Sequence, residues 1–249
     1  MREIITAALR RRRQLVLLGL ALGVGLALAA IGLRSVGGPV AALTLLPILF
    51  FVGMTVREVV RQPGREGLRV DEPGGAFLAP PQRGILYGPA LAGYLVYYAV
   101  YTLAGSAVDG WDVFFMAAYL LVAAGLAIGS WRLVPFVTLT PEGVASGAPR
   151  PMTVVPWEAI GAGTPTGPGA AGRFLRLPIA RPELVRRSLG WPRRGAFVAV
   201  RELTVAPDFL AAAIQYYVAH PEHRAAIGTA QEYDRLRREL AGVPLAGQV

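Results

Sequence analysis

Four long apolar stretches dominate the first half of the chain. Residues 15–33 read LVLLGLALGVGLALAAIGL and contain no charged side chain, and three more stretches cover about 40–56, 84–105 and 111–131. A helix of about 20 apolar residues crosses the roughly 30 Å hydrocarbon core of a bilayer. The last stretch begins with Trp111 and ends with Trp131, as expected for aromatic rings at two membrane interfaces. The pattern predicts four transmembrane helices in a membrane domain of residues 1–133.

The first stretch has a second interpretation, because the basic residues Arg10 to Arg13 precede it. A basic segment followed by an apolar run is also typical of a cleaved signal peptide. The run is longer than the usual apolar region of about 7–15 residues in such peptides, and three further spans follow. Retention as a transmembrane helix is therefore the favoured interpretation.

The arginines are distributed unevenly between the loops. The loop after the third span, residues 106–110, has no arginine and carries Asp109, whereas Arg2 and Arg10 to Arg13 precede the first span. Between the second and third spans lie Arg57, Arg61, Arg65, Arg69 and Arg83. The positive-inside rule then predicts a multi-pass protein of the plasma (inner) membrane, with both termini and the 57–83 loop in the cytoplasm. The Pro/Gly-rich composition of that loop predicts irregular backbone.

After Trp131 the pattern changes to short β-prone runs separated by turn residues. The runs are 136–140, 144–146, 152–155, 173–179 and 196–200. They predict a small sandwich or barrel. Apolar residues with helical spacing then predict a helix over 207–219, and Thr229 with Glu232 forms a capping-box pattern before a last helix over 230–240. The expected domains are 134–228, followed by a terminal helix and tail at 229–249.

Two short motifs in this region carry a resemblance. Thr140–Val144 reads TPEGV and Val155–Ile160 reads VPWEAI, and a helix leads into YYVAHPEHRAAIG. With the preceding spans, this order resembles bacterial multi-pass membrane proteins with a PH-like domain, the YcxB-like group being the nearest comparison. The resemblance covers about residues 134–228. It implies a seven-stranded, strongly bent β-sheet or barrel, closed at one end by the 207–219 helix. The expected fold class is therefore membrane α-helical plus an α+β cytoplasmic domain.

The composition excludes several kinds of chemistry. The chain has no cysteine, so disulfides, thiolate metal sites and cysteine nucleophiles are ruled out. Sequence motifs of serine hydrolases, zinc proteases, P-loop proteins and Rossmann domains are missing, as is any nucleic-acid-binding signature beyond charge. His220-Pro221-Glu222-His223 is interpreted as a helix-end charge pattern rather than a metal site. We expect no enzyme activity, no cofactor, no metal and no nucleic-acid partner.

The net charge of +9 includes a cluster of arginines in the C-terminal half. A basic patch beside an anionic leaflet gains about 1 kcal/mol per arginine. The candidate lipid- or partner-binding residues are Arg173, Arg176, Arg186, Arg187, Trp191, Arg193 and Arg194. The alternative is that these arginines are solvated loop charges that reinforce the topology.

The spans contain two further patterns. Tyr87, Tyr94, Tyr98 and Tyr101 share one face of the third span, either as a packed seam between helices or as a groove for a lipid-like ligand. Pairs of glycines four residues apart occur at 19/23, 84/88 and 125/129, a spacing that lets helix backbones approach closely. The span interiors contain no Asp, Glu, His, Lys or Arg, which argues against proton relays, voltage sensing and intramembrane hydrolysis.

The functional prediction is a non-catalytic inner-membrane protein. Its cytoplasmic domain is expected to scaffold a protein partner or to sense anionic membrane lipid. The alternative prediction is an accessory subunit or transporter for a hydrophobic small molecule, bound at the tyrosine face.

Overall fold

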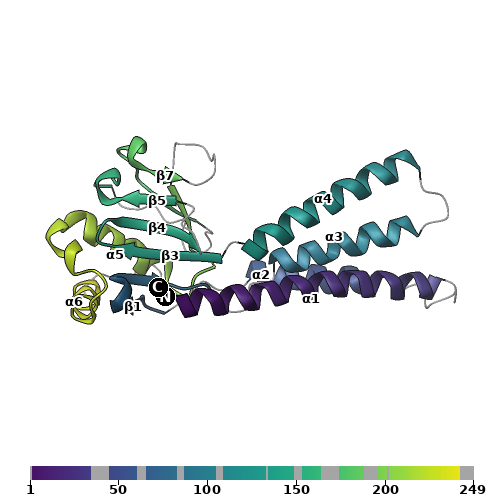
Figure 1. Ribbon diagram of the computed structural model, residues 1–249, viewed down its shortest axis with the longest axis horizontal. Coiled ribbons are helices and arrows are strands. Elements are labelled where there is room, and N and C mark those ends of the chain that lie inside the picture. The colour runs from purple at the N-terminus through teal and green to yellow at the C-terminus, as the bar shows by residue number, and fades with distance from the viewer. Residues whose placement is uncertain are drawn as a thin grey trace. The chain divides into compact units, whose positions relative to one another are not determined.

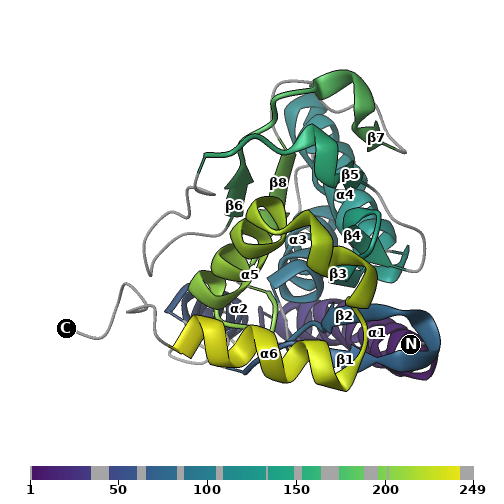
Figure 2. The same ribbon diagram turned by 90° about the vertical axis from the view of Figure 1, so that its left-hand side faces the viewer.

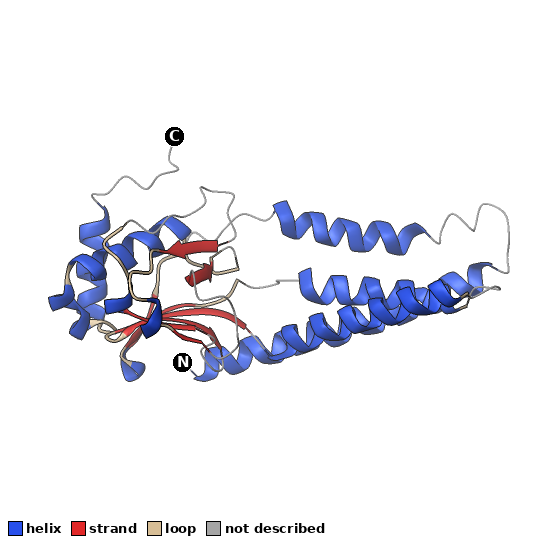
Figure 3. Cartoon of the chain, turned by 90° about the horizontal axis from the view of Figure 1, so that it is seen from above, coloured by secondary structure: helices blue, strands red, loops and turns tan. Residues whose placement is uncertain are grey.

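The computed structural model describes residues 2–34, 45–60, 66–82, 87–104, 109–132, 134–148, 153–163, 174–187, 196–200 and 202–241. The chain forms two compact units. One unit, Thr6–Arg61 with Gly84–Leu133, contains the long helices; the other, Met1–Ile5 with Gln62–Arg83 and Val134–Val249, contains all the described strands (Figure 1, Figure 3). The expected boundary between residues 133 and 134 therefore differs from this division, because residues 62–83 belong with the C-terminal part of the chain.

The helical unit contains four helices among the described residues. They are α1 (Arg2–Arg34), α2 (Leu46–Val60), α3 (Tyr87–Leu103) and α4 (Gly110–Arg132). Two of them are long and apolar enough to cross a membrane, over Thr6–Leu33 and Gly110–Trp131. The described parts of α2 and α3 have 15 and 17 residues, compared with about 20 in a typical transmembrane helix.

These helices expose many large apolar side chains. Leu121 is 74% exposed, Trp111 70% and Leu49 63%. Outside the helical unit, the large hydrophobic side chains that are exposed among the described residues are Phe174 and Leu184. A water-soluble protein rarely exposes a contiguous apolar surface on this scale, whereas a bilayer solvates it.

The contact between α1 and α3 depends on glycine. A Cβ atom added at Gly23 would lie 2.3 Å from the carbonyl oxygen of Gly93, and one at Gly19 would lie 2.5 Å from that of Pro89. The predicted close approach of backbones is therefore confirmed for the 19/23 pair. Gly84 lies outside the described residues, and a Cβ at Gly125 or Gly129 would meet nothing within 4 Å.

The main sheet of the other unit has six antiparallel strands. Their order across the sheet is β1 (Arg69–Asp71), β2 (Ala76–Ala79), β3 (Val134–Thr140), β4 (Gly143–Ala148), β5 (Thr153–Pro156) and β7 (Arg186–Arg187) (Figure 1). The predicted runs at 136–140, 144–146 and 152–155 correspond to β3, β4 and β5. The prediction of irregular backbone for the 57–83 loop is wrong, since this segment provides β1 and β2.

Strands β2 and β3 are antiparallel neighbours although α3 and α4 separate them in the chain. Phe77 pairs with Leu139 and Ala79 pairs with Val137. The end of β2 therefore lies beside the beginning of β3, where a hairpin would have a short turn. The two helices α3 and α4 are thus an insertion at the position of a hairpin turn.

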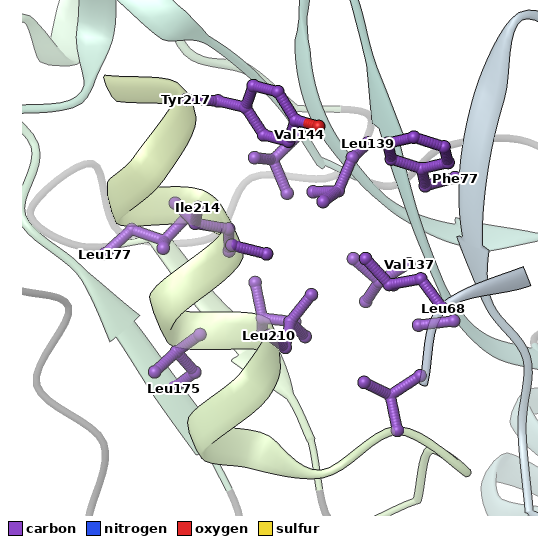
Figure 4. Close-up of a cluster of buried hydrophobic side chains, with 14 of the residues drawn as sticks. Leu68, Phe77, Val137, Leu139, Val144, Leu175, Leu177, Leu210, Ile214 and Tyr217 are labelled. Carbon is purple, nitrogen blue, oxygen red and sulfur yellow. The ribbon is translucent and has the colours of Figure 1, made fainter. Parts of the chain in front are cut away.

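A smaller sheet and helix α5 complete the core. Strand β6 (Phe174–Leu177) pairs with β8 (Ala196–Ala199), and α5 (Pro207–Ala219) lies next to this pair (Figure 2). In Figure 4, Leu210 and Ile214 of α5 lie among side chains from both sheets, including Val137 and Leu175, all of them buried in one cluster. The predicted helix over 207–219 is confirmed in its bounds.

The chain ends in α6 (Ala230–Ala241), whose Leu236 is completely buried in the same cluster. The helix therefore belongs to this unit rather than to a separate terminal segment. Only half of the predicted capping box forms. The backbone N–H of Glu232 donates to Thr229 Oγ1 at 3.2 Å, but the Glu232 carboxylate is buried and bonds to Tyr217 and Arg235.

Candidate functional site

The two motifs that carry the resemblance are joined through Trp157. This residue begins the 3₁₀ helix η3 (Trp157–Ala159) directly after β5, and its side chain is 2% exposed. Its indole Nε1–H donates to the Thr140 carbonyl at 2.9 Å, and its backbone N–H donates to the Glu142 backbone carbonyl at 3.2 Å. Trp157 therefore fixes the β3–β4 turn against the end of β5. This contact supports a structural role for both motifs.

Tyr217, Glu232 and Arg235 form a polar cluster between α5 and α6. The Tyr217 hydroxyl donates to Glu232 Oε1 at 2.9 Å, and Arg235 forms an ion pair with the same carboxylate. Burial, together with the hydrogen bond to Glu232, raises the pKa of Tyr217, so this hydroxyl stays protonated. A charged carboxylate at 3% exposure requires such partners. The cluster attaches α6 to α5.

The predicted basic segment is described in part. Arg176 on β6 and Arg186 on β7 are exposed, and of Arg187 the backbone alone is described. Arg173, Trp191, Arg193 and Arg194 lie outside the described residues. Strands β6 and β7 belong to different sheets, so the predicted residues share one stretch of chain rather than one strand.

Two exposed apolar residues accompany these arginines. Strand β6 alternates, with Leu175 and Leu177 in the core and Phe174 and Arg176 on the outer face. Phe174 is 51% exposed, and Leu184, in the 3₁₀ helix η4 (Pro182–Leu184), is 37% exposed. Exposed Arg181 immediately precedes η4. Phe174 shares the outer face of β6 with Arg176, and Leu184 lies in the chain between Arg181 and Arg186. Apolar side chains next to cations are the chemistry of the membrane–water interface. The alternation of residues 174–177 is a sequence signal that would have placed Phe174 on this face.

The predicted tyrosine face is occupied by packing contacts. The Tyr94 ring lies 6.0 Å from that of Phe51 in α2 and 6.4 Å from that of Tyr98, and Tyr98 lies 5.2 Å from Tyr119 in α4. Tyr101 stacks on Tyr97 at 5.7 Å. Of Tyr87 the backbone alone is described. Tyr94 and Tyr98 therefore contact rings on neighbouring helices, as in a helix–helix seam, whereas the contact of Tyr101 with Tyr97 lies within α3.

The two histidines converge on one carboxylate. His220 Nδ1 lies 3.1 Å from Glu222 Oε1, and His223 Nε2 lies 3.5 Å from the same oxygen. Possible ligand atoms of the three residues all lie within 4.8 Å of one another. The sequence interpretation found no third ligand near the histidines. The third donor is Glu222, which the chain turn at Pro221 brings between them.

Comparison of the chain with protein-family models, curated proteins and solved structures found no match.

Proposed function

We propose that the chain is a non-catalytic, four-span membrane protein whose sheet-containing unit docks on anionic lipid. The observation that carries this proposal is that Phe174 and Leu184 are exposed and lie close in the chain to the exposed arginines at 176, 181 and 186. Outside the helical unit, no other large hydrophobic side chain is exposed among the described residues. An apolar anchor with a basic surround binds a membrane by burying apolar area and by attracting anionic headgroups.

The pairing of β2 with β3 supports four crossings. A hydrogen-bonded sheet with exposed edges belongs in water, so β2 and β3 lie on one side of the membrane. The chain between them must then cross an even number of times. Since α4 is long and apolar enough to cross, α3 crosses with it. The exposed apolar surfaces of α1 and α2 support a second pair of crossings.

The arginine distribution supports the cytoplasmic side for the sheet-containing unit. Arg10 to Arg13 lie at the start of α1, whereas the connection between α3 and α4 has no arginine and carries Asp109. By the positive-inside rule, both termini lie on the cytoplasmic side of a bacterial inner membrane. The 62–83 segment lies on the same side of the membrane, because it is part of the same unit as the C-terminal half.

The resemblance to PH-like domains of the YcxB-like group is part of the proposal. It is supported by a meandering antiparallel sheet, a second small sheet and a following helix whose apolar face fills the core between them. Trp157 connects the two motifs that suggested the resemblance. This arrangement is suited to a scaffold that carries a docking surface.

The lipid proposal is tested with the full chain in nanodiscs. Because the chain has no cysteine, a single Glu183→Cys next to Leu184 accepts one environment-sensitive fluorophore. We expect a blue shift of its emission when phosphatidylglycerol is added to zwitterionic lipid, and reversal at high salt. The Arg176→Gln/Arg186→Gln variant should lose the shift. Arg237→Gln/Arg238→Gln, which removes the same charge from the exposed face of α6, should keep it. Equal emission in both lipids would contradict lipid docking and leave protein scaffolding as the role of the unit.

The alternative of a hydrophobic-ligand carrier has less support. The rings of Tyr94 and Tyr98 pack on Phe51 of α2 and Tyr119 of α4, so binding a ligand between these rings would require the helices to separate. A seam of this kind contributes to helix association in lipid, where the packing of side chains replaces the hydrophobic effect.

A further inference from the structure

The chain has two histidines in 249 residues, and both lie at the turn after α5. We propose that His220, Glu222 and His223 bind a divalent transition-metal ion of the Zn²⁺ class, with at least one coordination position open. The site includes none of the residues of the lipid-docking proposal and is independent of that proposal. It has the composition that such ions prefer, two imidazoles and one carboxylate.

The distances fit a shared ion. Zinc binds nitrogen and carboxylate oxygen at about 2.0–2.2 Å in a tetrahedron, which places neighbouring donor atoms about 3.3 Å apart. The observed separations from Glu222 Oε1 are 3.1 Å to His220 Nδ1 and 3.5 Å to His223 Nε2. All three donor atoms lie within 4.8 Å of one another. Small rotations of partly exposed side chains are therefore sufficient to close the site around an ion.

The backbone holds the three donors in this arrangement. The backbone N–H of His220 donates to the Tyr216 backbone carbonyl at 2.9 Å where α5 ends. Pro221 then starts the 3₁₀ helix η5 (Pro221–Ala226). The His223 N–H then donates to the His220 carbonyl at 3.2 Å, which closes the turn. Arg224 fixes the turn on α5, because its Nε donates to the Tyr217 carbonyl at 2.7 Å.

The imidazole rings are also positioned by an aromatic neighbour. The Tyr216 ring lies 4.6 Å from the His220 ring and 5.8 Å from the His223 ring, nearly parallel to the latter. Ligands held in place before binding lose less conformational entropy when the ion arrives. The His220 and Glu222 side chains are 46% and 59% exposed, so water or a donor from another molecule can complete the coordination.

Cobalt(II) is a spectroscopic probe for this site. In a tetrahedral field Co²⁺ absorbs visible light, and without cysteine any such band arises from nitrogen and oxygen ligands. The full-length protein is purified in detergent through a tag without histidine and titrated with Co²⁺. We expect a band that saturates at one equivalent and is displaced by Zn²⁺ but not by Mg²⁺.

Variants separate a metal site from a simple helix-end ion pair. His223→Ala should abolish the band, and Glu222→Gln should weaken binding by at least about tenfold, the loss that even an outer-shell change brings. Glu239→Gln, which neutralises an exposed carboxylate on α6, should bind as the parent does. Melting temperatures without metal check that each variant folds, and His223→Gln replaces His223→Ala if the latter does not. A band that survives loss of both histidines, or no binding by the parent protein, would overturn the proposal.

Discussion

A fragment of residues 134–241 is expected not to fold, whereas the same fragment joined to residues 62–83 is expected to unfold cooperatively. The missing segment supplies β1 and β2, and with them Leu68 and Phe77 of the buried core. Truncating one buried leucine or phenylalanine costs about 2–5 kcal/mol. Losing both, together with the strand that covers β3, removes an amount comparable to a whole domain's stability of about 5–15 kcal/mol.

The geometry of the sheet makes this experiment simple. Because Ala79 pairs with Val137, a short Gly/Ser linker joins residue 83 to residue 134 in place of the two helices. Thermal unfolding by circular dichroism is compared for the fragment, the fusion and a fusion carrying Phe77→Ser. The fusion should show a sharp transition that the other two lack. A cooperative transition at the same temperature in the 134–241 fragment would mean that the 62–83 segment is dispensable.

Gly23→Ala is expected to destabilise the helical unit by about 1–3 kcal/mol, the usual effect of overpacking. The added methyl would lie 2.3 Å from the Gly93 carbonyl oxygen, and a backbone carbonyl cannot rotate away as a side chain does. Helix α1 must then move away from α3, which weakens the close packing that drives association in lipid.

Gly25→Ala in the same helix is the matched control. A Cβ there would meet nothing within 4 Å, so the change should be neutral or stabilise the helix by up to about 1 kcal/mol. Unfolding of the full chain in detergent, followed at increasing temperature, compares the two variants. Equal stability of Gly23→Ala and Gly25→Ala would show that α1 and α3 do not touch at this site.

Periodicity predicted the parts of the fold whose pattern is long or regular. Strand β3 and helix α5 have clear periods of two and 3.6, and their predictions are confirmed. Strand β2 has four residues, all buried, and a short apolar run without alternation gives little signal. The Pro/Gly-rich composition of the 57–83 loop predicts irregular backbone, although Pro73-Gly74-Gly75 between two short runs is also typical of a hairpin. Gly75 adopts φ +57 there, a left-handed conformation that favours glycine.

The candidate sites depend on the fold to different degrees. The charge pattern of the sequence is sufficient to identify the arginines. The exposure of Phe174 and Leu184, in contrast, depends on which side of each element faces the core. The sequence favours a helix-end charge pattern for His220 and His223, because they lie beside a helix break and no third ligand is evident nearby. In the structure, the turn at Pro221 places Glu222 Oε1 within 3.5 Å of both histidines, where it can act as the third donor.

The central claim is that β2 and β3 form one sheet on the cytoplasmic side and that α3 and α4 cross the membrane between them. Single cysteines at Gly74, Gly110 and Glu183, all exposed positions, test it in cells treated with a membrane-impermeant maleimide. We predict that Gly110→Cys is labelled from outside, whereas Gly74→Cys and Glu183→Cys are labelled only after the membrane is permeabilised. Labelling of Gly74→Cys and Glu183→Cys from opposite sides, or of Gly110→Cys from the same side as both, would contradict the account.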